Sequence, residues 1–248
     1  MSEDNSGTTQ GTSDVGPGVE DVESGQVVVS FSGEEVVNLG VDKTITGSAA
    51  ADTIVFTSAN TTVEAGDGAN TITGTSGNNL ISAGIGADTI TVTTGHNSID
   101  AGSGINTITA MSGNNQITAG DGADTITLTS GNNKINAGGG INTIAATTGN
   151  NSITTGDGAD TITVSTGNNT IHARGGANTI TASSGVNTIT AGDGADTITT
   201  GGLTGGGNTI DAGNGANTVT TGAGNDTVTS GNGADTITTG AGDDTITV

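Results

Sequence analysis

The sequence lacks most of the residues from which globular domains build large cores. There is no Cys, Trp or Tyr, and only two Phe and one Pro occur among 248 residues. Without Cys, disulfides, thiolate metal sites and cysteine nucleophiles are excluded. Apolar residues make up only 30% of the chain, so a conventional core of large aromatic and aliphatic side chains is also excluded.

Positive charge is equally scarce. Three Lys and Arg residues stand against 25 Asp and Glu residues, which gives a net charge of −22. Nucleic acids and anionic membrane surfaces are bound through Lys and Arg, so neither is expected as a partner. No apolar run reaches the length of a membrane span, and the first residues lack the basic-then-apolar pattern of a signal peptide. The acidic excess instead favours solubility or a requirement for cations.

Glycine is abundant, at 46 residues, and it is periodic. From Ile45 to Ile198 every ninth residue is Ile, except Val63, and after residues 201–207 the same spacing resumes at Ile210. Gly precedes each of these aliphatic residues by four positions, and Asp or Asn by two, from the repeat of Ile72 onward. An aperiodic Gly-rich chain would be expected to be disordered. This regularity predicts a repeat architecture instead.

Each nonapeptide reads as a turn followed by a short strand. In residues 119–127 the Gly-rich half suits a turn, and Thr125-Ile126-Thr127 suits a strand. Because strand side chains alternate, Ile126 and Leu128 should point inward while Thr125 and Thr127 point outward. One repeat cannot bury its Ile alone, so repeats must stack. We predict an all-β fold, a parallel β-roll or β-solenoid with about 18 residues (two nonapeptides) per coil and roughly eleven coils.

Two kinds of turn alternate along the chain and should form the two edges of the solenoid. One carries Gly-x-Gly-Ala/Ile-Asp/Asn, as in residues 120–124, and defines the Asp/Asn edge. The other carries Ser/Thr-Gly-Asn-Asn, as in residues 130–133, and defines the Asn edge. On the Asp/Asn edge, Asp and Asn alternate with a period of 36 residues.

Residues 221–229 and 239–247 show the pattern most fully, as Thr-Gly-Ala-Gly-Asn-Asp-Thr-Val-Thr and Thr-Gly-Ala-Gly-Asp-Asp-Thr-Ile-Thr. Here the sequence resembles the calcium-binding nonapeptide repeats of the repeats-in-toxin (RTX) family, G-G-x-G-x-D-x-U-x. The resemblance covers roughly residues 45–248, although the first Gly is mostly Ala, Thr or Val. It implies Ca²⁺ bound between stacked turns by carbonyl and Asp oxygens. It also implies type I secretion to the cell surface or the extracellular space, with which the missing signal pattern agrees.

The resemblance and the coordination preferences of Ca²⁺ single out one set of carboxylates. The predicted metal ligands are Asp88, Asp124, Asp160, Asp196, Asp226, Asp235 and Asp244. Further carboxylates in the same turns should point outward; these are Asp67, Asp121, Asp157 and Asp193. The alternative is that the turn Asp residues only cap backbone N–H groups. The Asn edge should instead be a metal-free amide ladder of Asn79, Asn97, Asn115, Asn133, Asn151, Asn169 and Asn187.

One sheet should carry a regular outward array of Thr. Its members are Thr89, Thr91, Thr107, Thr109, Thr125, Thr127, Thr161, Thr163, Thr179, Thr181, Thr197 and Thr199. The opposite sheet is irregular, with Lys134 and His172 among its outward residues. The array resembles the Thr-x-Thr faces of β-solenoid antifreeze proteins, and Thr148-Gly-Asn150 resembles the Thr-x-Asn rows of an RTX-type ice-binding module. The alternative is that Thr is simply the default exposed strand residue of a duplicated repeat.

These features predict five segments: a flexible acidic arm (1–24), an apolar N-terminal cap or first coil (25–56), a regular solenoid (57–200), an insertion loop (201–207) and C-terminal RTX-like coils (208–248). No catalytic set is expected, because His96 and His172 are interpreted as exposed surface residues. The leading hypothesis is a secreted structural protein that binds calcium and itself, head-to-tail or laterally, in a filament, surface layer or matrix. The alternatives are an ice-binding protein and a spacer of a larger adhesin, with ice or a cell-surface polysaccharide as partner.

Overall fold

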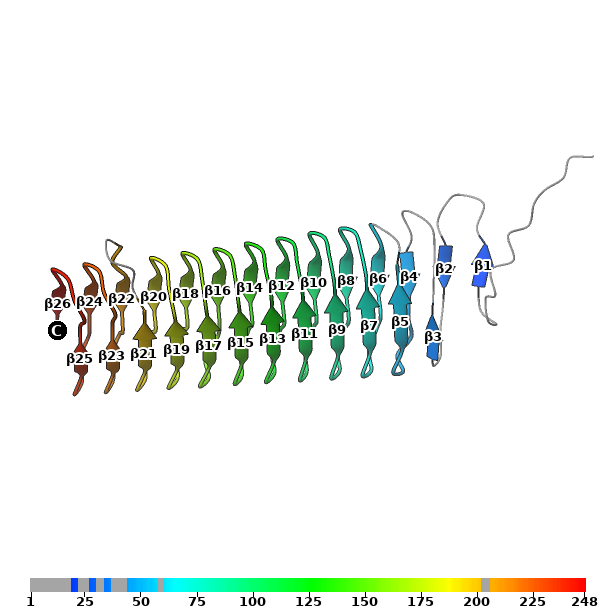
Figure 1. Cartoon of the computed structure of the whole chain (residues 1–248). Coiled ribbons are helices and arrows are strands. Elements are labelled where there is room, and N and C mark those ends of the chain that lie inside the picture. Colours follow the sequence, from blue (N-terminus) through cyan, green and yellow to red (C-terminus); the bar gives the residue numbers. More distant parts are fainter. Residues whose placement is uncertain (1–18, 22–26, 30–33, 37–43, 58–59, 202–205) are drawn as a thin grey trace, which may run out of the picture.

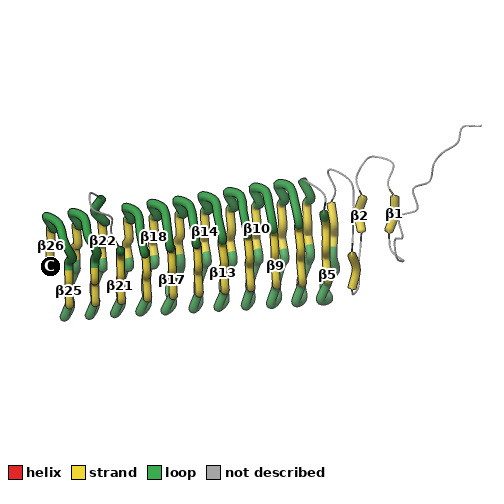
Figure 2. The backbone as a smooth tube through the Cα atoms, viewed as in Figure 1, coloured by secondary structure: helices red, strands yellow, loops and turns green. Residues whose placement is uncertain are grey.

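The computed structural model describes residues 19–21, 27–29, 34–36, 44–57, 60–201 and 206–248. The described chain is a straight rod of stacked coils built from strands and turns (Figures 1 and 2). Each coil contributes one strand to each of two parallel sheets of twelve strands. The all-β parallel solenoid with 18-residue coils, about eleven in number, is thereby confirmed.

The odd-numbered strands form one sheet. They are β3 (Glu34–Val36), β5 (Thr53–Phe56), β7 (Thr71–Gly74), β9 (Thr89–Val92), β11 (Thr107–Ala110), β13 (Thr125–Leu128), β15 (Thr143–Ala146), β17 (Thr161–Val164), β19 (Thr179–Ala182), β21 (Thr197–Thr200), β23 (Thr218–Thr220) and β25 (Thr236–Thr238).

The even-numbered strands form the other sheet. They are β4 (Thr44–Thr46), β6 (Thr62–Glu64), β8 (Leu80–Ser82), β10 (Ser98–Asp100), β12 (Gln116–Thr118), β14 (Lys134–Asn136), β16 (Ser152–Thr154), β18 (Thr170–His172), β20 (Thr188–Thr190), β22 (Thr209–Asp211), β24 (Thr227–Thr229) and β26 (Thr245–Thr247). A separate antiparallel pair joins β1 (Val19–Asp21) to β2 (Val27–Val29).

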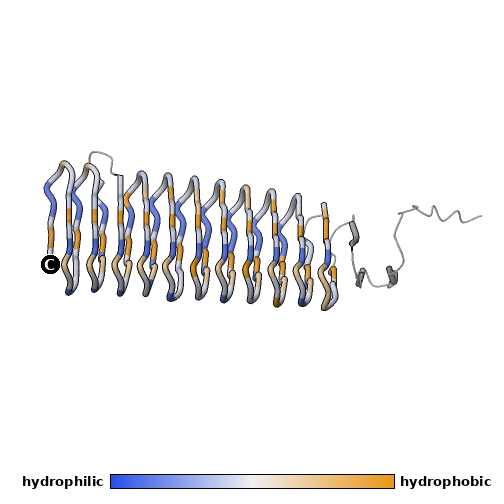
Figure 3. The backbone as a smooth tube through the Cα atoms, turned by 90° about the horizontal axis from the view of Figure 1, so that it is seen from below, coloured by the Kyte–Doolittle hydropathy of each residue, from blue (hydrophilic) through white to orange (hydrophobic). Residues whose placement is uncertain are grey.

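The core is a stack of aliphatic side chains in exact 18-residue register. Ile108 pairs with Ile126, and Ile126 with Ile144, so like residues lie above one another. Ile126 and Leu128 are buried while Thr125 and Thr127 are exposed, as alternation predicts. Apolar positions, orange in Figure 3, recur at the same places in successive coils, and their buried side chains form one hydrophobic cluster. Burial of this thin Ile, Val and Ala core replaces the large core that the composition excludes.

Glycine is required where the turns of neighbouring coils stack. Gly122 has φ of 155°, and a Cβ there would lie 1.7 Å from the Gly104 carbonyl oxygen of the preceding coil. Its amide donates to the Gly139 carbonyl of the next coil at 3.0 Å. Main-chain atoms of neighbouring coils therefore touch directly through the turns.

The structure describes only parts of the predicted N-terminal segments and of the predicted insertion loop. The acidic arm lies outside the described residues apart from β1, and the proposed cap is described only at 27–29, 34–36 and 44–56. Residues 202–205 of the insertion loop are also outside them. On either side of that loop the register is kept with a spacing of 21 residues, as Thr188 pairs with Thr209. None of the described segments forms a helix that could cross a membrane.

Candidate calcium turns and threonine face

The Asn edge is a continuous amide ladder. Each inner Asn Nδ2 donates to the Oδ1 of the Asn one coil ahead, as from Asn115 to Asn133 at 3.0 Å and from Asn133 to Asn151 at 3.0 Å. The same Oδ1 atoms accept backbone N–H groups, for example that of Asn115 at 2.9 Å. Side chains on this edge thus satisfy one another from Asn79 through Asn208. The predicted amide ladder is confirmed.

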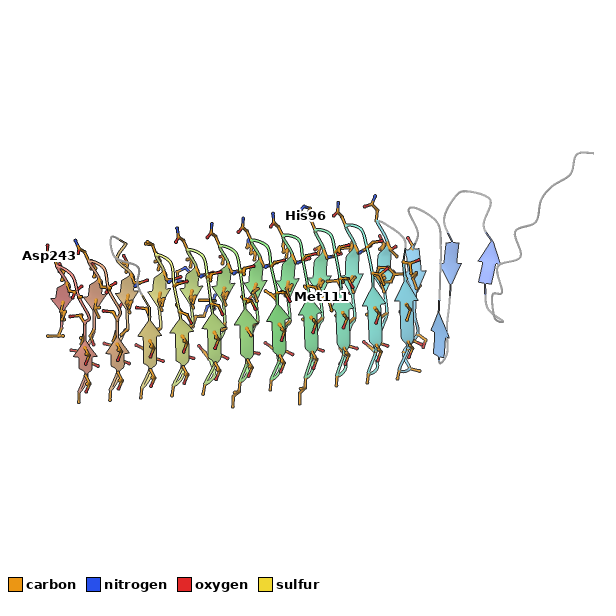
Figure 4. All side chains as sticks on the ribbon, viewed as in Figure 1. His96, Met111 and Asp243 are labelled. Atoms are coloured by element: carbon orange, nitrogen blue, oxygen red, sulfur yellow. The ribbon has the colours of Figure 1, made fainter. Side chains whose placement is uncertain are left out.

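A second, exposed row runs along the outside of the same edge. Asn132 Oδ1 accepts the N–H of Asn150 at 2.7 Å, and the pattern repeats along the rod. His96 is a member of this row, because its Nδ1 accepts the N–H of Asn114 at 2.9 Å (Figure 4). Asp243 lies at the far end of the row, where its N–H donates to Asn225 Oδ1. His96 and His172 are both exposed, as predicted, and His96 is also a link between coils.

Neighbouring coils are joined on the Asp/Asn edge by the same kind of hydrogen bond, from a backbone N–H to a side-chain Oδ1. The N–H of Asn106 donates to Asp124 Oδ1 at 2.7 Å, and the N–H of Asp124 donates to Asn142 Oδ1 at 3.1 Å. Asp and Asn therefore occupy equivalent positions, with Oδ1 in the same role. The second atom of each side chain, Nδ2 of Asn or Oδ2 of Asp, must then occupy equivalent positions as well.

The second atom is where the two residue types differ. Asn106 Nδ2 donates to three carbonyl oxygens, those of Gly102, Gly104 and Ala119, at 3.1–3.5 Å. In five buried Asp residues the Oδ2 atom has no hydrogen-bond partner; these are Asp88, Asp124, Asp160, Asp196 and, on the other edge, Asp226. By the 18-residue equivalence, Asp124 Oδ2 faces the carbonyls of Gly120, Gly122 and Ala137. Acceptors would then face acceptors, an arrangement that a bound cation or a proton relieves.

Burial has the expected effect on these carboxyl groups. Desolvation raises the pKa of Asp124 from 3.8 to about 6, against hydrogen bonds from Asn106 that lower it. It likewise raises the pKa of Asp88, Asp160 and Asp196. In the turn of Asp160 the Thr155 hydroxyl donates to the Ala173 carbonyl at 2.9 Å, so its hydrogen is not available to the carboxylate. The charged form of each carboxylate is therefore disfavoured in the fold unless a cation accompanies it.

A pH dependence follows for the calcium-free protein. A carboxyl whose pKa is raised binds its proton more tightly in the folded than in the unfolded chain, so folding stability should fall as the pH rises from about 4 to about 6. Protein stripped of calcium on a chelating resin should accordingly melt at a higher temperature at pH 4.5 than at pH 7.5. Circular dichroism melting measures this, and a midpoint that rises over the interval would contradict the burial of charged carboxylates.

The oxygen atoms at these turns suit a calcium ion whose ligands come mainly from the backbone. No three His, Asp or Glu side chains converge anywhere in the part of the chain that the structure describes. A cation at Asp124 would thus bind one carboxylate and several turn carbonyls, both of which are common Ca²⁺ ligands. Asp52 is different, because Ser48 caps it: the Ser48 N–H donates to Asp52 Oδ2 at 2.7 Å, and its hydroxyl lies within 3.3 Å of both carboxylate oxygens.

The three C-terminal candidates are divided between the edges. Asp235 continues the Asp/Asn edge, since the Asn217 N–H donates to it at 2.9 Å. Asp226 and Asp244 continue the Asn edge: the Asn208 N–H donates to Asp226, and the Asp226 N–H to Asp244. The Asp226 turn has changed to the type seen at the Asp/Asn edge, because the Gly224 N–H bonds the Ala241 carbonyl of the next coil. Within this turn Thr221 Oγ1 and Asp226 Oδ2 are both buried and without a partner.

The outward side of the odd-numbered sheet is here called the threonine face. Two columns of Thr run along it in register, Thr107 beside Thr125 and Thr109 beside Thr127, and all twelve predicted members are at least partly exposed. A third column, which the sequence analysis missed, follows the strands. It consists of Thr75, Thr93, Met111, Thr129, Thr147, Ser165 and Ser183. Ladder bonds such as Thr129 N–H to the Ala110 carbonyl extend the flat surface to this column, and Met111 is its apolar member (Figure 4).

The threonine face is free of charge from β5 to β25, although the protein carries −22. Between β5 and β25 the carboxylates lie on the turns or on the even-numbered sheet, where Glu64, Asp100 and Asp211 are exposed. Asp67, Asp121, Asp157 and Asp193 are exposed on the Asp/Asn edge, as predicted. Two such rods therefore repel one another least when they approach through their threonine faces.

Comparison with known families identifies the repeat. The model of the RTX calcium-binding nonapeptide repeat (4 copies) matches residues 64–99, 100–135, 136–171, 172–202, 204–237 and 229–247. These matches cover well over half of the chain, so the protein belongs to the family of RTX calcium-binding nonapeptide repeats, for which Ca²⁺ is the expected ligand. No curated protein and no solved structure matches the sequence.

Proposed function

We propose that this chain is a structural protein of the cell surface or extracellular space, exported by type I secretion, whose rods are folded by calcium and associate with one another. Calcium would be held at Asp88, Asp124, Asp160, Asp196, Asp226, Asp235 and Asp244. The role is that of a building element of a filament, surface layer or matrix, without enzymatic activity. Family membership supports calcium binding and is typical of secreted proteins.

The uncharged threonine face is the observation that supports self-association. Its first two columns run from β7 to β25 and its third from Thr75 to Ser183, with about 4.8 Å between neighbours along the rod and roughly 7 Å between columns. A second copy offers the same spacing, so hydroxyl and methyl groups can meet over the whole length. Regular, flat and uncharged surfaces of this size are suited to contact. The opposite sheet, with Lys134, Asp100 and His172 exposed, offers no such repeat. End-to-end association is a further mode of the same proposal.

Substitution on the face tests this proposal. Thr125→Tyr places a bulky ring in the middle of the first column and should abolish rod association while the melting temperature in calcium changes little, since Thr125 is exposed. Ser152→Tyr on the opposite sheet is the matched control and should associate like the wild type. Electron microscopy and sedimentation velocity at high protein concentration in calcium measure both. A wild type that stays monomeric there would refute the proposal.

Ice binding is the second candidate, and the third hydroxyl column favours it. A two-dimensional array of Thr and Ser at fixed spacing on an uncharged face could order water in a lattice. Thermal hysteresis and ice-crystal shaping measure this activity, and Thr125→Tyr should remove it while Ser152→Tyr keeps it. Loss of hysteresis with no change in association would assign the face to ice, and the converse result would assign it to another rod. A rod that neither associates nor binds ice would be consistent with a spacer.

A further inference from the structure

Every second turn of the Asp/Asn edge closes its interior with an amide. In these turns the Asn side chain donates through Nδ2 to carbonyls of its own turn, and in three of them also to a carbonyl of the next coil. The five residues are Asn70, Asn106, Asn142, Asn178 and Asn217. All five are buried. The carbonyl oxygens that a cation would need are thus already paired in these turns.

In the intervening turns the same interior is without a donor. The carboxylates of Asp88, Asp124, Asp160 and Asp196 present a buried Oδ2 without a hydrogen-bond partner at the position equivalent to Nδ2. Geometry alone does not distinguish the two residue types, because both accept a backbone N–H of the preceding coil through Oδ1. The two kinds of turn differ in the partner of their carbonyl oxygens. An Asn amide supplies it in one turn, and a cation bound from solution would supply it in the next.

We propose that the Asn residues of the Asp/Asn edge are built-in substitutes for calcium, so that cation sites on this edge occur once in two coils. This inference rests on the proposed calcium-dependent rod and assigns its sites. An Asn turn can admit a cation only by breaking two or three hydrogen bonds and turning its amide hydrogens away. An Asp turn cannot close without one at neutral pH.

The alternation also has an electrostatic consequence. No two adjacent turns of this edge carry a buried carboxylate from Asp52 to Asp235. Bound divalent ions would be two coils apart, about 9.5 Å at ordinary strand spacing, and an amide would lie between them. Repulsion between neighbouring ions at that distance is roughly half of that for ions in every coil. The amide turns therefore hold the coils together between sites without adding charge.

Two reciprocal substitutions in the full-length chain test this inference, with Ca²⁺ alone as the probe. Asp124→Asn should bind one calcium fewer than the wild type, counted by native mass spectrometry, and should melt at a higher temperature than the wild type in calcium-free buffer. Asn106→Asp should melt at a lower temperature than the wild type without calcium and recover when calcium is added.

The outcomes separate this inference from the proposal on which it rests. An unchanged calcium count in Asp124→Asn, or a calcium-free melting temperature below that of the wild type, would overturn the amide substitution and leave the calcium-dependent rod intact. A wild type that binds no calcium would overturn both. If Asn106→Asp fails to fold even in calcium, that result also counts against the inference, and the Asp124→Asn count stands as an independent test.

Discussion

Withdrawal of calcium at pH 7.5 should unfold most of the rod. At a calcium concentration 1,000-fold above its dissociation constant, each site contributes about 4 kcal/mol to folding. Five buried carboxylates, each with an Oδ2 that has no hydrogen-bond partner, define the sites that lose this contribution. Their sum exceeds the roughly 5–15 kcal/mol by which ordinary domains are stable. Far-UV circular dichroism in calcium and in excess chelator measures the effect, and we expect the strand signal to be lost in chelator and restored by calcium.

Magnesium is the control for this experiment. Mg²⁺ demands a compact octahedral set of ligands and gives up its water reluctantly, so it should not replace Ca²⁺ in turns made mainly of fixed carbonyl oxygens. Equal recovery in either ion would indicate general charge screening in place of specific sites. A strand signal and melting curve that are identical in calcium and in chelator would contradict the calcium dependence itself.

The second large effect is expected on the opposite edge, from Asn133→Asp. Asn133 is buried, and its Nδ2 donates to Asn151 Oδ1 at 3.0 Å and to the Gly131 carbonyl at 2.9 Å. A carboxylate there would face two acceptors, and its Ser-Gly-Asn turn is not of the type found at the Asp/Asn edge. The lost hydrogen bonds and the buried charge should cost about 3 kcal/mol or more. Chemical denaturation monitored by circular dichroism measures the loss.

The neighbouring residue provides a matched control. Asn132 is exposed, and its Oδ1 accepts the Asn150 N–H at 2.7 Å. A carboxylate oxygen can accept the same bond, so Asn132→Asp should change stability by less than about 0.5 kcal/mol. Calcium should not rescue Asn133→Asp, whereas it should rescue Asn106→Asp on the other edge. Recovery of Asn133→Asp in calcium would show that both edges bind the ion alike.

Most of the fold could be predicted because each rule is repeated in every coil. Nine-residue spacing of Ile, with Gly and Asp or Asn at fixed offsets, specifies stacked strands and turns, and strand alternation assigns Ile126 inward and Thr125 outward. The Asn ladder could be predicted as well, because identical side chains at identical positions must stack. Each period of the sequence corresponds to one coil in the structure, displaced along the rod from the coil before it.

Features that depend on contacts between particular neighbouring side chains could not be predicted from the repeat. The third hydroxyl column was missed because the odd-numbered strands from β5 to β21 are one residue longer than the even-numbered strands, as β13 is relative to β14. The spacing of Thr125, Thr127 and Thr129 could have revealed it. The sequence shows that Asp and Asn alternate, but not that one amide closes the ring of carbonyls that a carboxylate leaves open. The capping of Asp52 by Ser48 is likewise a contact that no repeat rule contains.

The number of calcium ions bound per chain tests the central claim most directly. Native mass spectrometry of the full-length wild type at saturating calcium should show five to seven ions. One is expected for each of the five carboxylates whose Oδ2 has no hydrogen-bond partner, and up to two more at the half-buried Asp235 and Asp244. A count near the number of turns, about twenty, would show that Asn turns bind calcium as Asp turns do. A count of zero would contradict the account as a whole.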